Sequence, residues 1–78
     1  MATETLERDQ DELTPAGKPK AQIPQDIDGN AAVIISRTCR NLRRTGHTDT
    51  EILRYANDAK SGNYDKVLQV TMDWADFV

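Results

Sequence analysis

The sequence is poor in the residues on which many specialised small proteins depend. Its 78 residues include one cysteine and one histidine, so an internal disulfide is excluded and a zinc site built from Cys and His ligands would be incomplete. No apolar run approaches the ~18 residues of a membrane span, and no signal-peptide pattern is present. These absences predict a reduced, cytoplasmic protein with no metal, no cofactor and no membrane partner.

Net positive charge is also lacking. The chain has 10 Lys and Arg against 13 Asp and Glu, a formal net charge of −3 and a pI of about 4.9. The field of the whole protein therefore does not favour nucleic acid or an anionic membrane, and any such binding would have to be local. A chain of this length supports one small core with roughly 3–5 kcal/mol of net stability, which argues against a large active-site cavity.

The composition changes near Asp28. Residues 1–27 hold six acids, three bases, all three prolines and no sustained apolar periodicity. Such a composition cannot bury enough apolar surface to offset the entropy lost on ordering. We therefore expect a flexible acidic tail over residues 1–27, which carries the net negative charge, and a folded domain over residues 28–78.

The first predicted helix begins after a polar cap and ends at a glycine. Either Asp28 or Asn30 can cap its N-terminus, and apolar residues then recur with the 3.6-residue period of a helix. Gly46 stands where a left-handed C-terminal cap would fall. The helix is expected to span about residues 31–45.

Two further helices are predicted downstream. Thr48 and Glu51 have the spacing of a capping box, which indicates a second helix over about residues 49–60. Asn63 is a favourable N-cap for a third helix that takes in the run VLQVTMDWADFV. Three short helices with short connections predict an all-α fold, a small three-helix bundle preceded by a disordered N-terminal tail.

The first helix carries a row of arginines opposite its apolar seam. Arg37, Arg40 and Arg44 follow the i, i+3, i+7 spacing of one helix face. One interpretation is structural: the arginines favour the negative end of the helix dipole and pair with acids from the tail or from the third helix. The other is functional, a site for an anionic ligand or an acidic partner. Both interpretations stay open at this point.

The third helix has more apolar surface than a three-helix core requires. One face suffices for the core, yet Val70, Trp74 and Phe77 extend the apolar surface around the helix. Surplus apolar surface in a small domain usually marks a partner site or a self-association face, unless the tail folds back over it or it stays exposed. The candidate partner-binding residues are therefore Val70, Trp74, Phe77, Arg37, Arg40 and Arg44.

No residue pattern supports catalysis. His47 lies in the turn between the first two helices, where a lone histidine is usually a capping or exposed residue. Cys39 lies at the edge of the first apolar seam, as expected for a small core residue. The spacing suggests no nucleophile and base pair. We predict a protein without enzymatic activity.

Four short motifs resemble a group of short proteins encoded in bacteriophage and prophage genomes. The motifs are DGNA, LRRTG, TEI and SGNYDKVLQ, spread between Asp28 and Trp74. In that group the first motif is followed by an aromatic residue where this chain has Ala32, and a glycine is common where it has Ser36. The resemblance implies a phage accessory protein in the host cytoplasm that binds a host component and redirects or inhibits it.

Two functions compete at this stage. The first is a non-enzymatic accessory protein that binds a host protein, or its own copy, through the apolar face of the third helix, with the arginines as a polar specificity element. The second is a sequestering or regulatory module for an anionic ligand, nucleotide or nucleic acid, in which Arg37, Arg40 and Arg44 contact phosphate. We favour the first, because the net charge of the chain does not attract phosphate.

Overall fold

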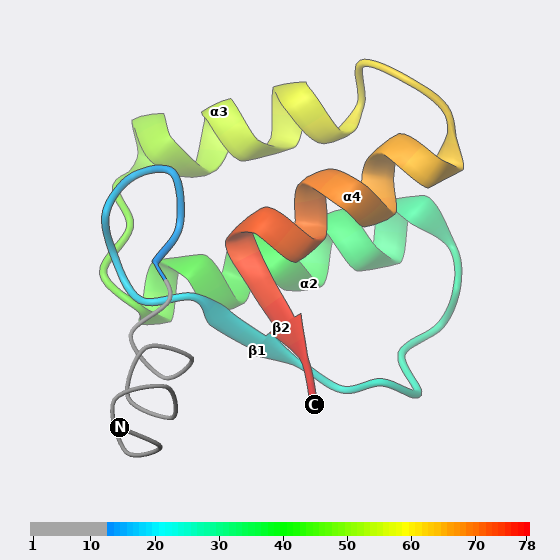
Figure 1. Ribbon diagram of the computed structural model, residues 1–78, viewed down its shortest axis with the longest axis horizontal. Coiled ribbons are helices and arrows are strands. Elements are labelled where there is room, and N and C mark those ends of the chain that lie inside the picture. Colours follow the sequence, from blue (N-terminus) through cyan, green and yellow to red (C-terminus); the bar gives the residue numbers. More distant parts are fainter. Residues whose placement is uncertain (1–12) are drawn as a thin grey trace, which may run out of the picture.

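Three helices and two short strands make up the fold of the residues that the structure describes. The structure, a computed structural model, describes residues 13–78. In chain order the elements are β1 (Ala21–Ile23), α2 (Ala31–Arg44), α3 (Asp49–Ala59), α4 (Tyr64–Trp74) and β2 (Ala75–Phe77). Each helix contacts the other two, β1 packs on α2, and β2 continues directly from α4 (Figure 1). The sheet therefore lies at one side of the helical layer rather than between helices.

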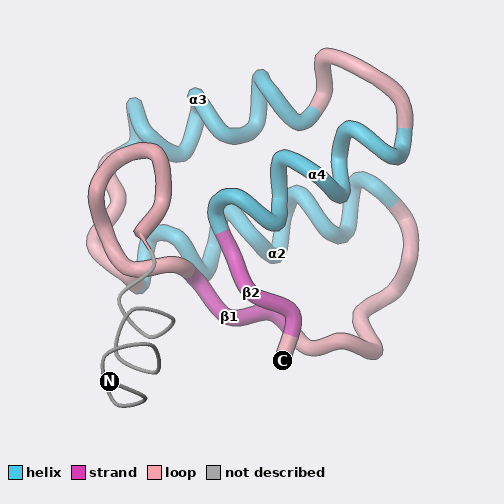
Figure 2. Tube along the Cα trace, in the orientation of Figure 1, coloured by secondary structure: helices cyan, strands magenta, loops and turns pink. Residues whose placement is uncertain are grey.

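The two strands pair in parallel, with Ile23 opposite Phe77. The ladder continues beyond β2, because the Val78 N–H donates to the Ile23 carbonyl at 2.8 Å and the Gln25 N–H donates to the Val78 carbonyl at 2.9 Å. Figure 2 shows this pair joining the segment before the first helix to the segment after the last one. The chain is thus closed by contacts between regions far apart in the sequence.

The prediction of an all-α bundle behind a disordered tail is wrong. Ala21 and Ile23, both placed in the expected tail, are fully buried, and β1 alternates buried, exposed, buried as a strand with one face on a core does. At the outer edge of β1, the Gln22 carbonyl accepts a hydrogen bond from Nδ2 of Asn41 at 2.8 Å. The part of the expected tail formed by residues 1–12 lies outside the described residues.

The helices begin at the caps that the sequence indicates. Asn30 and Asn63 each accept a hydrogen bond from the first turn of the following helix, α2 and α4 respectively. Thr48 and Glu51 form the expected capping box at the start of α3. Gly46, in the turn between α2 and α3, has a φ of 91°, a conformation that glycine adopts without the strain of a side chain.

The end of α4 differs from the prediction. The helix stops at Trp74, and Ala75 is extended with φ −149° and ψ 158°. The last residues alternate apolar, polar, apolar, which suits a strand with one side against a core. Residues that would have enlarged the apolar face of a longer helix therefore leave the helix and pair with β1.

Every element contributes to one hydrophobic core. An aromatic group lies within it, where the Trp74 ring centroid is 6.0 Å from that of Tyr55 and 5.7 Å from that of His47. The hydroxyl groups of Tyr55 and Thr71 are 2.7 Å apart, so the buried phenol has a hydrogen-bond partner. The buried hydrophobic residues are Ala21, Ile23, Ile34, Ile35, Leu42, Ile52, Tyr55, Ala56, Ala59, Val67, Val70, Trp74 and Ala75.

Candidate functional site

The apolar face expected on the third helix is not exposed. The residue surface of Val70 is 4% exposed and that of Trp74 is 2% exposed, and Phe77 is partly buried against the same core. Trp74 contacts His47, and the guanidinium of Arg54 lies 5.8 Å from its ring centroid. The helical wheel of α4 alone cannot show this burial, because α4 packs against α2 and α3 and the Trp74 ring lies against Tyr55 and His47. Val70 and Trp74 therefore lie in the core and Phe77 packs partly against it, so the three do not form the exposed apolar face that was expected.

His47 is a buried structural residue rather than an exposed capping residue. Its Nδ1 lies 3.1 Å from the Leu42 carbonyl and 2.9 Å from the Thr45 hydroxyl, and its Nε2 lies 2.9 Å from the hydroxyl of Thr14. A carbonyl can only accept, so the bond to Leu42 requires a hydrogen on Nδ1, and Nε2 of the neutral ring then accepts from Thr14. The imidazole thereby ties the segment before β1 to the α2–α3 turn.

A second link from the same segment is an ion pair. Nζ of Lys18 lies 2.7 Å from Oε1 of Glu51 and 3.0 Å from the Gly46 carbonyl. The hydrogen bond from Lys18, with a further one from the Thr48 backbone, lowers the pKa of Glu51 to about 2. Sequence analysis missed Thr14 and Lys18 because both lie in the segment expected to be disordered.

Arg37, Arg40 and Arg44 lie on α2, where all three are exposed. Within residues 13–78, no ion pair or hydrogen bond reaches the guanidinium groups of Arg37, Arg40 and Arg44. The neighbouring Arg43 does have a partner, Asp49 at 3.1 Å. The expected pairing of the row with acids of the third helix is therefore not found in the described part of the chain. We call Arg37, Arg40 and Arg44 the arginine row.

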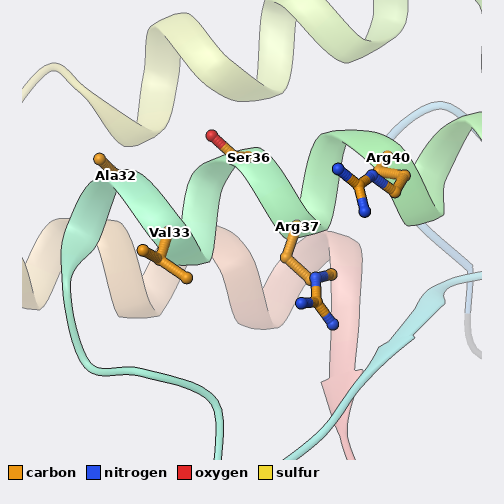
Figure 3. A pocket seen from close by; sticks show the side chains of 5 residues that line it. All are labelled: Ala32, Val33, Ser36, Arg37 and Arg40. Carbon is orange, nitrogen blue, oxygen red and sulfur yellow. The ribbon is translucent and has the colours of Figure 1, made fainter.

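A shallow depression adjoins the arginine row. It has a volume of about 290 Å³ and is lined by Ala32, Val33, Ser36, Arg37 and Arg40. Figure 3 shows Ala32 and Ser36 along one edge of α2 and Val33 and Arg37 along the other, with Arg40 further along the helix. The small side chains of Ala32 and Ser36 leave space in the depression, and Val33 adds apolar surface. The guanidinium groups of Arg37 and Arg40 supply positive charge. This combination suits a carboxylate-bearing segment of polypeptide.

A second depression, of about 400 Å³, lies between α2 and β1 and is lined by Lys20, Gln22, Asn41, Arg44 and Thr45. Its polar groups mainly serve the fold. Nζ of Lys20 donates to the Met72 carbonyl at 2.9 Å and lies 3.8 Å from the carboxylate of Asp76. The Thr45 hydroxyl bonds to the Leu42 carbonyl. Arg44 lines this depression from the end of the arginine row.

The Cys39 thiol and the possible metal ligands are the remaining chemical groups of residues 13–78 to consider. Burial raises the pKa of the Cys39 thiol, an effect that Lys60 and Arg43 only partly oppose, so the thiol stays protonated at neutral pH. Among residues 13–78, no three His, Cys, Asp or Glu side chains are grouped so that they could hold a metal ion. None of α2, α3 and α4 has both the length and the apolarity needed to cross a bilayer.

Comparisons with known proteins leave the site to be interpreted from its own geometry. No family model, no curated protein and no solved structure matches the chain. The resemblance to phage-encoded proteins therefore stays a prediction. The feature that the fold does not use, and that a ligand could use, is the outer face of α2.

Proposed function

We propose that this protein is a non-enzymatic binding module that engages an acidic segment of a partner protein through the outer face of α2. The observation that carries the proposal is the arginine row, whose guanidinium groups have no carboxylate partner within residues 13–78. Like charges at these helical spacings repel by roughly 0.2–0.5 kcal/mol per pair, so the repulsion within the row opposes helix stability. Carboxylates of a ligand would replace that repulsion with charge-assisted hydrogen bonds.

The surroundings of the row favour a protein over nucleic acid. Val33 and Ala32 place apolar surface beside the guanidinium groups of Arg37 and Arg40, a mixture common at protein interfaces. Nucleic-acid sites rely on broad positive surface and on exposed aromatic rings for stacking. This chain has a net charge of −3, and Tyr64 is the one clearly exposed aromatic residue in the part that the structure describes.

The nature of the partner follows from the same surface. A host protein with a carboxylate-rich segment would fit both the arginine row and the accessory role that the resemblance to phage-encoded proteins implies. Self-association through α4 loses its support, because Val70 and Trp74 are buried. The competing function is binding of a nucleotide or nucleic acid through the same arginines. The test below distinguishes it from binding of an acidic protein segment.

Fluorescence anisotropy with two labelled probes tests the proposal. One probe is a ten-residue polyglutamate peptide and the other a single-stranded oligonucleotide of equal charge, both at 50 mM NaCl. We expect the protein to bind the peptide, and Arg37→Gln with Arg40→Gln to weaken that binding about three- to tenfold, as the loss of two exposed charge pairs would.

The matched control is Lys60→Gln with Lys66→Gln, which removes the same charge from the end of α3 and the start of α4. It should leave the affinity for the peptide within about twofold of the unmodified value. Equal losses in both double variants would show attraction by net charge alone and contradict the proposal. Tighter binding of the oligonucleotide than of the peptide, with the same dependence on the arginines, would favour nucleic acid instead.

A further inference from the structure

We infer that the arginine row of one molecule binds the exposed side of α4 on a second molecule of the same chain. The inference rests on the proposed function, because it takes carboxylates as the ligands of the row. It names one pair of such ligands, Asp65 and Asp73, which are both exposed on α4. The contact does not involve Val70 and Trp74, which are buried.

The two carboxylates of α4 lack a cation, just as the arginine row lacks an anion. Asp65, Gln69 and Asp73 follow the i, i+4, i+8 spacing of neighbouring residues on a helix surface. In the described part of the chain, no ion pair or hydrogen bond reaches either carboxylate. Asp58 and Asp76, by contrast, lie 3.9 Å and 3.8 Å from a lysine. The charges of the two helices are therefore complementary.

Apolar side chains border these carboxylates. Tyr64 is 44% exposed, Met72 is 56% exposed, and Leu68 between them is partly buried. Tyr64 directly precedes Asp65, and Met72 directly precedes Asp73, so each acid has an exposed apolar neighbour. An arginine side chain packs its aliphatic stem on apolar surface while its charged end reaches further. This side of α4 therefore offers an arginine both apolar contact and a carboxylate.

The two surfaces have similar lengths. With a rise of about 1.5 Å per residue, Arg37 and Arg44 lie about 10 Å apart along the axis of α2. The corresponding separation of Asp65 and Asp73 along α4 is about 12 Å. In an antiparallel arrangement, Arg44 faces Asp65 at one end of the contact and Arg37 faces Asp73 at the other. The helix dipoles favour this arrangement, because it brings the C-terminal end of α2 to the N-terminal end of α4.

The two surfaces of one molecule do not meet. Helices α2 and α4 pack on each other through their buried sides, and Figure 1 shows α4 in front of α2. Their exposed sides therefore face away from each other, so a second molecule has to supply the acids. A contact between two different surfaces adds molecules head to tail and does not close a symmetric dimer. A contact along one side of two short helices is small, so we expect association only at high protein concentration.

Sedimentation velocity between about 20 μM and 1 mM protein, at 50 mM NaCl, measures the association. We expect the unmodified protein to form oligomers as its concentration rises, and 500 mM NaCl to reduce them because salt screens exposed charges. Asp65→Asn with Asp73→Asn, the α4 variant, should raise the apparent dissociation constant about three- to tenfold, as the loss of two exposed charge pairs would. An unmodified protein that stays monomeric at 1 mM would overturn the inference.

The matched control is Asp26→Asn with Asp58→Asn, which removes two exposed acids elsewhere. Each of these double variants changes the formal net charge from −3 to −1, so repulsion between molecules falls equally in both. The control should therefore associate at least as strongly as the unmodified protein. Equal dissociation constants for the α4 variant and the control would overturn the inference.

A mixing experiment tests the pairing of the two surfaces directly. The row variant, Arg37→Gln with Arg40→Gln, retains the acids of α4, whereas the α4 variant retains the arginine row. Each variant should associate more weakly by itself than the unmodified protein. The equimolar mixture should form a one-to-one complex with an affinity within about twofold of that of the unmodified contact, because each variant supplies the surface that the other lacks. A mixture that associates no more than the separate variants would overturn the inference.

Failure of the inference and failure of the proposed function have different signatures. If the polyglutamate peptide binds the row while the unmodified protein stays monomeric, the proposed function stands and the inference fails. The exposed side of α4 would then be free for a basic segment of a different protein. If the protein associates but the α4 variant and the row variant do so equally well, another surface holds the molecules together. The inference fails in that case too, and the peptide alone decides the proposed function.

Discussion

The end of α4 and the outer face of α2 were both candidate binding surfaces, and the fold treats them in opposite ways. Val70 and Trp74 are almost completely buried, because α4 packs against α2 and α3 and the Trp74 ring lies against His47 of the α2–α3 turn. Arg37, Arg40 and Arg44 stay exposed, and nothing in residues 13–78 neutralises them. In this small domain, the apolar surface of α4 is covered by segments that are distant in the sequence. The like charges of the arginine row, by contrast, stay exposed.

Truncating Trp74 should have the largest effect on stability. Trp74→Ala removes a 2%-exposed ring that contacts Tyr55 and His47, and removal of a buried aromatic ring of this size costs about 3–5 kcal/mol. A domain of this size has a comparable net stability, so we expect a largely unfolded protein by far-UV circular dichroism. Met72→Ala, at an exposed position of the same helix, should retain the fold. A folded, thermally unchanged Trp74→Ala protein would contradict the buried position.

A somewhat smaller loss is expected at β1. Ile23→Ala empties a fully buried site, and changes of this type cost about 2–5 kcal/mol. The neighbouring Gln22→Ala alters an exposed side chain and should cost less than about 0.5 kcal/mol, because its backbone carbonyl can still accept from Asn41. Urea unfolding measures the stability of both variants. Equal midpoints for the two variants would mean that residues 21–23 do not contribute to the core.

The ion pair of Lys18 and Glu51 should give a smaller, pH-dependent contribution. The pKa of Glu51 is about 2 in the folded protein, below its ordinary value of 4.5, so the ionised carboxylate stabilises the fold above pH 4.5. That stability is lost as the pH falls from 4.5 towards 2. The destabilisation caused by Glu51→Gln, measured by urea unfolding, should therefore be larger at pH 7 than at pH 2. A difference that does not depend on pH would contradict the ion pair.

Changing the arginine row should have the smallest effect. Arg37→Gln with Arg40→Gln should alter the free energy of unfolding by less than about 1 kcal/mol, because both side chains are exposed and have no partner in residues 13–78. Arg43→Gln is the informative comparison, since it removes the 3.1 Å contact with Asp49. Unfolding of the double variant, measured by thermal denaturation, would show that the row is structural.

The features that could be predicted from the sequence depend on short stretches of chain. The capping box of Thr48 and Glu51 and the N-caps Asn30 and Asn63 involve residues within three positions of one another, so the pattern contains the whole interaction. The exposure of the arginine row follows in the same way from the helical period and the buried seam opposite it.

The features that were missed depend on contacts across the whole chain. Each strand has three residues, too few for an alternating pattern to stand out, and each is stable only because the other is present. The burial of Val70 and Trp74 likewise depends on the packing of α4 against α2 and α3, which a helical wheel of α4 does not contain, so the wheel assigns them to the wrong environment. The absence of an ion partner for Arg37, beside the paired Arg43, is likewise a property of three-dimensional placement.

The parallel pairing of β1 with β2 has a consequence for synthesis on the ribosome. The strand that contains Ile23 emerges before α2, whereas its partner follows α4. Translation proceeds at about 5–20 residues per second, and contacts between distant segments form more slowly than local ones. Helices α2 and α3 can therefore form during synthesis, but Ile23 must wait for Phe77 before its hydrogen bonds are complete. A nascent chain that pauses within α4 would present unpaired β1 to chaperones and proteases.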